Sequence, residues 1–333
     1  MNGVSGMNPS RVAPPPTLSK VIDVKVLLVQ VDGKLPNLAL MKLSSWHKAQ
    51  GDIVGFNVAD PDRIYVSIVF KRNKENSLGI PRLYSDAEVF YGGPGHDLEA
   101  ELPEEIEFLV PDYSLYPKMD FSMGFTTRGC IRNCYFCIVP EKEGLLTRWQ
   151  HPREFHNPAF KKVMLLDNNW LADKEWFLET SQWIIDNKLS LREGGMDIRL
   201  LDDDMADQLS KIDFYKPMHF AFDQDADKDD VLKGIQMLSK HNINLRQKVQ
   251  FFVYIDGPEQ VQSGLARCQQ LKKWGTNPFV MYNMDRPRNN EIRHLQRWAN
   301  RKWLFWKIDF SEYGKKSPHH QRFEIREVDA NVH

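Results

Sequence analysis

The sequence predicts an α/β protein in which a small doubly wound, Rossmann-like domain precedes a partial (βα)6 barrel of the TIM type. Two observations support this prediction. An apolar, strand-like run covers residues 24–31, and six later strand-like runs are separated by helical patterns. A full barrel needs eight such units, so an open doubly wound sheet is the alternative. In either fold, ligands gather at the carboxyl ends of the parallel strands.

The composition of the 333-residue chain agrees with this fold class. Hydrophobic residues make up 42% and charged residues 27%, which supplies a sizeable core and excludes wholesale disorder. There are 44 Lys and Arg against 45 Asp and Glu, and this balance gives no sign of a polyanion-binding domain. No apolar run has the length of a membrane span or the form of a signal peptide. We therefore expect a cytoplasmic protein with no membrane partner.

Four segments divide the chain. Residues 1–19 contain three consecutive prolines and predict a flexible tail. Residues 20–119 form the small α/β domain, and residues 120–285 form the partial barrel. The basic and aromatic segment 286–333 predicts a helical extension or strap. A solvated helix face that buries Trp298 explains its basic residues better than a nucleic-acid surface does, so we expect no nucleic-acid partner.

The N-terminal domain begins with a run typical of a buried parallel strand, residues 24–31. Residues 36–50 have apolar side chains at helical spacing, with a proline suited to the first turn and Gly51 as a stop signal. Shorter strands are predicted at 52–57, 63–70 and 87–93. The glycines of the last of these, in the run YGGPG, predict a tight turn, with close approach to a ligand as the alternative.

The predicted barrel alternates strands with helices, as a parallel sheet requires. Its six strands are predicted at 124–129, 162–167, 195–201, 218–223, 249–256 and 278–283. The helices between them are predicted at 173–187, 203–211, 227–240 and 258–274. The segment 97–120 is acidic and rich in proline, and it predicts a linker or strap before the first of these strands.

Three of the four cysteines lie within eight residues, at Cys130, Cys134 and Cys137. Such crowding in a long chain indicates a metal or cluster site in a reducing compartment rather than a disulfide framework. Three thiolates can hold a [4Fe–4S] cube and leave one iron open to a small molecule. Arg128 and Arg132 add positive charge that favours deprotonated thiols. Structural zinc is the alternative, and it would need a fourth ligand from Cys268, His151 or His156.

The cysteines have C-x3-C-x2-C spacing, Phe136 precedes the last of them, and the motif follows the first of six predicted strands. In these features the chain resembles the radical S-adenosylmethionine (SAM) superfamily. The resemblance implies that the three cysteines hold a [4Fe–4S] cluster and that SAM chelates its fourth iron. One-electron reduction by an external flavodoxin- or ferredoxin-like donor would give methionine and a 5′-deoxyadenosyl radical. That radical would abstract a hydrogen atom from a substrate, which the sequence does not identify.

The resemblance also implies a set of SAM contacts. Where relatives carry Gly-Gly-Glu after the second strand, this chain reads Asp167-Asn168-Asn169, and Asp167 is the candidate acceptor for the SAM ammonium. Asp197 and Arg199 are expected on the third strand, facing the same way, with a structural ion pair between them as the alternative. The remaining candidates are Asp223 at the end of the fourth strand, and Tyr135 and Phe136 beside the adenine.

The N-terminal α/β domain resembles two branches of this superfamily. The run at 134–144 is similar to methylthiotransferases, but no cysteine precedes Cys130 to hold their second cluster. The other branch binds cobalamin, and here Lys34 stands where its lower-ligand histidine is expected. His47 is expected to be a surface or capping residue rather than a ligand. A cobalamin-dependent radical SAM methyltransferase therefore stays open, as does a non-catalytic module that binds a structural metal or cluster.

Overall fold

The computed structural model describes residues 23–313. Backbone contacts divide the chain into two compact units. The first contains the described part of residues 1–168 together with 187–189, and the second contains 169–186 and the described residues from 190 onward. The predicted tail 1–19 and the end of the predicted extension 286–333 lie outside the described residues. The domain limits at 119 and 285 stay predictions.

The first unit contains a four-stranded parallel sheet with the strand order β2-β1-β3-β4. Its strands are β1 (Lys25–Gln30), β2 (Ile53–Gly55), β3 (Arg63–Ser67) and β4 (Glu88–Gly92). All four predicted strands of this domain are confirmed. Val26, Leu27 and Leu28 are consecutive buried residues of β1, as expected for a central strand covered on both faces.

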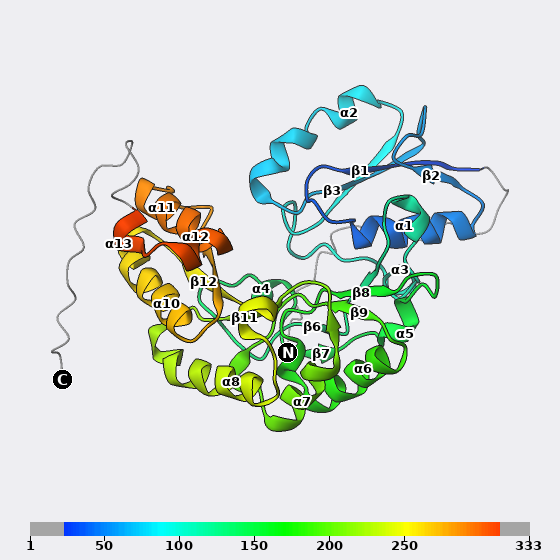
Figure 1. Cartoon of the computed structure of the whole chain (residues 1–333). Coiled ribbons are helices and arrows are strands. Elements are labelled where there is room, and N and C mark those ends of the chain that lie inside the picture. The colour runs from blue at the N-terminus through cyan, green and yellow to red at the C-terminus, as the bar shows by residue number, and fades with distance from the viewer. Residues whose placement is uncertain (1–22, 314–333) are drawn as a thin grey trace, which may run out of the picture. The chain divides into compact units, whose positions relative to one another are not determined.

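Helix α1 (Leu38–Ala49) confirms the predicted helix and packs on one face of this sheet (Figure 1). Leu40 and Leu43 of this helix join the core beneath it. The helix begins after Asn37, whose side chain accepts a hydrogen bond from the Leu40 amide at 3.1 Å. The short helix α2 (Ile80–Leu83) belongs to the segment that packs on the opposite face. This part of the first unit therefore has helical segments on both faces of a parallel sheet.

The remaining part of the first unit positions the cysteines. The chain passes through α3 (Glu104–Glu107) to β5 (Ser122–Gly124), which pairs in parallel with β8 (Lys162–Leu165). Between these strands, a short antiparallel ribbon joins β6 (Thr127–Arg128) to β7 (Thr147–Arg148). The segment between the two ribbon strands carries the three cysteines and α4 (Val139–Lys142), and α5 (Pro152–Phe155) follows β7.

One continuous strand over residues 124–129 was predicted, and this prediction is wrong. β5 ends at Gly124 because the amides of Thr126 and Thr127 turn away from the sheet and donate to the buried carboxylate of Asp167. The chain resumes extended pairing only in β6, now antiparallel and with a different partner. The cysteines therefore follow a ribbon, not a barrel-type strand.

The second unit contains parallel strands and the helices between them. β9 (Ser190–Arg192) pairs with β10 (Asp213–Phe214), and a separate sheet has the order β11-β12-β13. The strands of that sheet are β11 (Met218–Ala221), β12 (Val249–Ile255) and β13 (Asn277–Tyr282). Helices α6 (Lys174–Asp186), α7 (Asp203–Lys211), α8 (Lys228–Lys240) and α10 (Val261–Lys273) follow one another in Figure 1. The short α9 (Leu245–Lys248) precedes β12. The chain is thus a mixed α/β protein with parallel sheets.

The predicted third strand over 195–201 is wrong. The strand in this region is β9, and residues Ile198–Leu200 form a 3₁₀ helix instead. Asp197 ends the extended backbone because its side chain accepts the amide of Arg199 at 3.1 Å and so caps that helix. Met196 keeps one parallel bridge, to Phe220 of β11.

The described part of the C-terminal segment, up to residue 313, forms three helices, α11 (Asn290–Ala299), α12 (Lys302–Lys307) and α13 (Phe310–Tyr313). Trp298 is fully buried, and its indole N–H donates to the carbonyl oxygen of Ile308 at 2.9 Å. A helix that buries this tryptophan agrees with the structural interpretation of the basic residues. Among residues 23–313, no helix combines the length and the apolar character needed to cross a bilayer.

Candidate functional site

The segment that follows β6 turns sharply at Gly129. Its φ is +74°, and a Cβ at this position would overlap the carbonyl oxygen of Leu145, which precedes β7. The next amide, that of Cys130, donates to the carbonyl oxygen of Gly144 at 3.3 Å. The cysteine segment is therefore closed at its base by backbone contacts that only glycine permits at position 129.

The three cysteines are half-buried, and backbone amides point at two of their sulfur atoms. The amide of Arg132 lies 3.4 Å from Sγ of Cys130, and the amide of Val139 lies 3.4 Å from Sγ of Cys137. The amide of Cys137 donates to the carbonyl oxygen of Cys134 at 2.9 Å, which tightens the turn between them. Backbone N–H groups directed at sulfur are a recurring feature of iron–sulfur sites.

The residue types of this donor set, three thiols on one segment, fit a cluster held by three thiolates. Within the described part of the chain, no group of three or more His, Cys, Asp or Glu side chains is placed to hold a metal ion. Two features support binding of a cluster: three thiols lie on one closed loop, and backbone N–H groups lie near two of their sulfurs.

The alternative of structural zinc needs a fourth ligand, and each candidate has another structural role. Cys268 is fully buried, and burial raises the pKa of its thiol to about 12, which disfavours the thiolate that zinc requires. His151 caps α5 by accepting the amide of Arg153 at 3.2 Å. His156 Nδ1 lies 3.0 Å from the hydroxyl of Ser122. These contacts do not favour a closed four-ligand zinc site.

Tyr135 and Phe136, the residues expected beside adenine, lie on this same segment. Their rings meet edge to face with centroids 5.1 Å apart. Tyr135 is 66% exposed. Their contact with SAM stays a prediction.

Glu143 ties the two ends of the cysteine segment together, and no sequence pattern indicated this role. Its Oε2 accepts the Gly129 amide at 2.9 Å and the Nδ2 of Asn168 at 2.8 Å. The same oxygen lies 3.1 Å from Nε of Arg128, whose guanidinium also stacks 4.3 Å from the ring centroid of Phe125. The positive charge of Arg128, expected to act on the thiols, is thus largely compensated by a carboxylate.

Asp167 fixes the backbone just before the ribbon. It is 1% exposed, and its carboxylate accepts the amides and hydroxyls of both Thr126 and Thr127, with the two hydroxyls at 2.6 and 2.7 Å. Burial raises the pKa of Asp167, against the lowering effect of these four donors. These contacts make Asp167 a positioning residue for the segment that leads to Cys130, and its expected bond to the SAM ammonium stays a prediction.

We expect Asp167→Ala to destabilise the protein by about 3 kcal/mol, because the two threonines would lose their buried acceptor. The thermal midpoint should fall by roughly 4 °C, measured by circular dichroism. Asp120→Ala is the matched control, since Asp120 is 67% exposed and pairs with Lys162 at the surface. Equal midpoints for the two variants would contradict the role of Asp167.

The second unit holds the other predicted cofactor residues in two groups. In the first, Oδ1 of Asn169 accepts the amide of Asp197 at 3.0 Å. Asp197 in turn pairs with Arg199 through both oxygens, at 2.7 and 3.0 Å, and Arg199 also reaches Asp227 at 2.9 Å. The ion pair between Asp197 and Arg199, the structural alternative, is therefore present. It comes from a 3₁₀ turn and not from strand alternation.

Asp223 forms the second group, just beyond the end of β11. Its Oδ1 accepts the Tyr254 amide at 2.7 Å, and its carbonyl oxygen accepts a hydrogen bond from Arg267. Burial raises the pKa of Asp223 to about 6, with Arg267 opposing this shift. This carboxyl group therefore changes its charge near neutral pH.

This shift predicts a pH-dependent stability. The pKa of Asp223 is about 6 in the folded chain, against a reference value of 3.8 for the unfolded chain. Between these two pH values the folded state therefore binds more protons than the unfolded state. The contribution of Asp223 to stability then falls as pH rises from about 4 to 6, and is constant above. We expect Asp223→Asn to match the wild type near pH 4 and to exceed its stability at pH 7 by up to about 3 kcal/mol.

Urea unfolding at a series of pH values tests this expectation. Asp256→Asn is the control of opposite sign, because hydrogen bonds from Asn283 and Arg286 lower the pKa of Asp256. That variant should lose stability relative to the wild type above pH 4. A difference between Asp223→Asn and the wild type that does not change with pH would refute the assignment.

The turn after β1, where cobalamin-binding relatives carry their histidine, is closed by its own side chains. The side-chain Nε2 of Gln30 donates to the carbonyl oxygens of Asp32 and Leu35, both at 3.0 Å. Asp32 accepts the amides of Val69 and Phe70 at 2.8 and 3.0 Å. Gly93, in the YGGPG turn, has φ +89° and packs against the backbone of Ile68, so it fills a tight turn. These contacts give both turns a structural role, and cobalamin binding stays a prediction.

His47 was expected to be a surface or capping residue, and the expected surface position is wrong. It is fully buried, with Nδ1 2.6 Å from Asp52 and Nε2 3.2 Å from the hydroxyl of Tyr65. Burial lowers its pKa despite the neighbouring carboxylate. His47 is therefore a structural residue that joins the end of α1 to β3.

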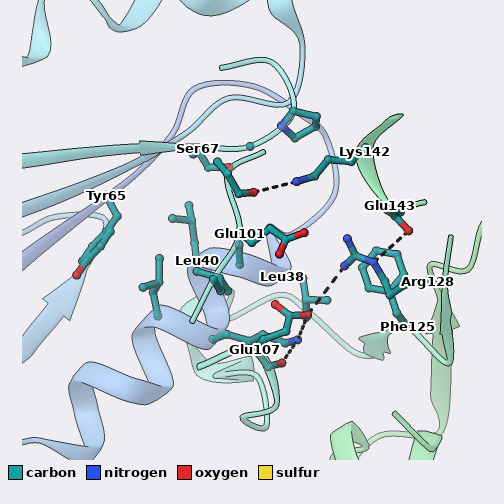
Figure 2. Close-up of a pocket in the computed structure, with 18 of the residues that line it drawn as sticks. Leu38, Leu40, Tyr65, Ser67, Glu101, Glu107, Phe125, Arg128, Lys142 and Glu143 are labelled. Atoms are coloured by element: carbon teal, nitrogen blue, oxygen red, sulfur yellow. Dashed lines mark hydrogen bonds and ion pairs between the residues drawn. The ribbon is translucent and has the colours of Figure 1, made fainter. Parts of the chain in front are cut away.

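A cavity of about 630 Å³ lies within the first unit, beside the ribbon that carries the cysteines. Its walls come from α1, from the carboxyl ends of β3 and β4, from the segment 100–108, and from β6, β7 and α4. Figure 2 shows Arg128 and Glu143 on the ribbon side, with Leu38, Leu40 and Tyr65 on the sheet side. The edges of the cysteine segment thus form part of the wall of a ligand-sized cavity.

Two charged residues of this cavity were missed by sequence reasoning. Lys42 is 2% exposed, and its ammonium group donates to the carbonyl oxygen of Glu107 and to its carboxylate, the latter at 2.9 Å. Burial lowers the pKa of Lys42. Only the position of Lys42 on the apolar face of α1, one turn after Leu38, hinted at burial.

Comparisons with known proteins add no relative to these observations. No protein-family model and no curated protein sequence matches the chain.

Proposed function

We propose that this protein is a radical SAM enzyme that binds one [4Fe–4S] cluster through Cys130, Cys134 and Cys137. The observation that carries the proposal is the C-x3-C-x2-C segment, closed at its base by Gly129 and with backbone N–H groups directed at two sulfurs. When bound and reduced, the cluster with SAM would supply a 5′-deoxyadenosyl radical that removes a hydrogen atom from a substrate.

The chain's own residues would hold and orient these groups. The three thiolates bind the cluster, and the amides of Arg132 and Val139 donate to sulfur. Glu143 holds the segment in place through its bonds to Gly129 and Asn168. Together they give a fixed loop on which a cluster keeps one position.

Asn169 is the best-supported contact to SAM. It is 3% exposed, and its Nδ2 is buried without a hydrogen-bond partner among the described residues. A buried donor without an acceptor is costly, so a bound oxygen atom of the cofactor would complete it. Arg199 and Asp223 already have partners in the chain, and we propose them only as residues that orient this neighbourhood.

The finer architecture and setting belong to the same proposal. The strands β5, β8, β9, β11, β12 and β13 would be the six strands of a partial barrel. An external flavodoxin- or ferredoxin-like protein would supply the electron. Three reduced thiols require a reducing compartment, and the cytoplasm provides one.

Anaerobic reconstitution of the full chain with iron and sulfide tests the proposal. We expect about four irons per chain, a brown protein, and 5′-deoxyadenosine after addition of dithionite and SAM. A chain that binds metal but neither shifts its spectrum with SAM nor releases 5′-deoxyadenosine would be a structural metal module. A chain that binds no iron would refute the proposal.

A further inference from the structure

The cavity in the first unit is lined mainly by apolar and aromatic side chains. These include Leu38, Leu40, Leu43, Phe90, Leu102 and Trp149. A volume of about 630 Å³ lies in the range of small-molecule sites, and apolar walls contribute to binding by removing apolar ligand surface from water. A ligand that fills this cavity would therefore be compact and mostly apolar.

The cationic groups of the cavity are already engaged. Lys42 binds Glu107 through both the backbone and the carboxylate, and Arg128 lies between Glu107 and Glu143, at 3.9 and 3.1 Å (Figure 2). The ammonium group of Lys142 donates to the carbonyl oxygen of Ala100 at 2.9 Å. An anionic ligand would have to displace one of these contacts, which costs the bond that it replaces.

Two carboxylates at the rim, by contrast, are not engaged. Within residues 23–313, Glu101 and Glu104 have no ion-pair partner, and both line the cavity. The lining carries Glu101, Glu104, Glu107 and Glu143 against Lys42, Arg128 and Lys142, so acidic groups exceed basic ones by one. Spare negative charge at the mouth of an apolar cavity favours a ligand with a cationic end.

We propose that this cavity binds the substrate, and that the substrate is a mostly apolar molecule that carries an amino group. The apolar body lies against α1 and the sheet, and the ammonium group faces Glu101 and Glu104. That the cavity binds such a ligand does not depend on the proposed function; that the ligand is the substrate does. The link between the two is that β6, β7 and α4, the elements that enclose the cysteines, also line the cavity.

A matched ligand series tests the class directly. Isothermal titration of the full chain uses three probes with one ring system: 1-naphthylmethylammonium, 1-naphthalenemethanol and 1-naphthoate. We expect the ammonium probe to bind at least about tenfold more tightly than the carboxylate, with the alcohol between them. Equal or tighter binding of 1-naphthoate overturns the proposal, and so does the absence of binding by all three at millimolar concentration.

The variants locate the binding. Ala39→Phe and Ala100→Phe place a ring in the cavity from two different elements, and each should weaken binding of the ammonium probe by more than tenfold. Ala49→Phe is the matched control because Ala49 is exposed on the same helix as Ala39. If Ala39→Phe does not fold, as judged by circular dichroism, Ala100→Phe carries the test. Wild-type affinity in the folded blocking variants refutes this location.

The carboxylates have their own control. The double change Glu101→Gln with Glu104→Gln should reduce the preference for ammonium over carboxylate to less than about threefold. Glu105→Gln changes a neighbouring exposed carboxylate of α3 that does not line the cavity, and it should leave the preference unchanged. An unaltered preference in the double variant contradicts the assignment of the ammonium site.

These binding measurements need neither cluster nor SAM, so they fail or succeed separately from the proposed function. Iron content and 5′-deoxyadenosine formation are measured on the same preparations. Binding of the ammonium probe by a chain that holds no iron would leave the cavity assigned and the enzyme activity refuted. An active chain that does not discriminate between the probes would refute only the substrate class.

Discussion

Replacing any one of Cys130, Cys134 and Cys137 by alanine should abolish formation of 5′-deoxyadenosine. A cube held by three thiolates cannot lose one of them and keep a defined open iron, so we expect a loss of at least about a thousandfold. Iron content should fall in parallel, while far-ultraviolet circular dichroism should stay unchanged. The measurement is product formation under anaerobic conditions, with iron assayed on the same sample.

The fourth cysteine supplies the control for this prediction. Cys268 is fully buried on α10, and we expect Cys268→Ala to keep iron and activity within about twofold, with only a small loss of stability for the removed sulfur. If the alanine variants of the triplet unfold instead, the thiols act as a structural clip. If the variants keep full activity, the cysteines are not the cluster ligands.

Gly129→Ala is expected to have the second-largest effect. The new Cβ would overlap the carbonyl oxygen of Leu145, and the residue would also have to keep a φ of +74°. Because backbone cannot give way as a flexible side chain can, the ribbon must open, and we expect a loss of more than about 3 kcal/mol and of most of the bound iron.

Gly144→Ala separates the two causes. Gly144 has a similar φ of +71°, but nothing lies within 4 Å of its added Cβ. It should therefore cost only the conformational penalty of about 1–2 kcal/mol and retain its iron. Thermal unfolding and iron content of both variants check the comparison. Equal losses would show that conformation alone, and not the overlap with Leu145, makes Gly129 necessary.

The parts of the fold that local patterns could predict are those with long apolar or strictly alternating runs. The strand over 24–31 and the helix over 36–50 each have one dominant periodicity, and both are present as β1 and α1. The third strand was misplaced because β9 has only three residues. The neighbouring run MDIRLL alternates like a strand, but the side-chain cap of Asp197 turns it into a 3₁₀ helix.

The candidate site shows the same limit. The cysteine triplet could be recognised because its residues are close in sequence, and spacing alone carries the chemistry. The structural roles of Asp167 and Lys42 could not be predicted, because their partners are distant in sequence. Thr126 and Thr127 lie 41 and 40 positions from Asp167. Glu107 lies 65 positions from Lys42. A single sequence gives the residue type at each position, but it does not give which distant residues meet.

The pair formed by Arg128 and Glu143 has a consequence for how the molecule would respond to its ligands. Both residues line the cavity, and both also brace the loop that carries the thiols. Any occupant that moves this pair must change the free energy of metal binding at the loop. By linkage, metal at the loop then changes the affinity of the cavity by the same factor. The two sites share the pair Arg128–Glu143, so ligand binding at one site is coupled to binding at the other whenever binding displaces this pair.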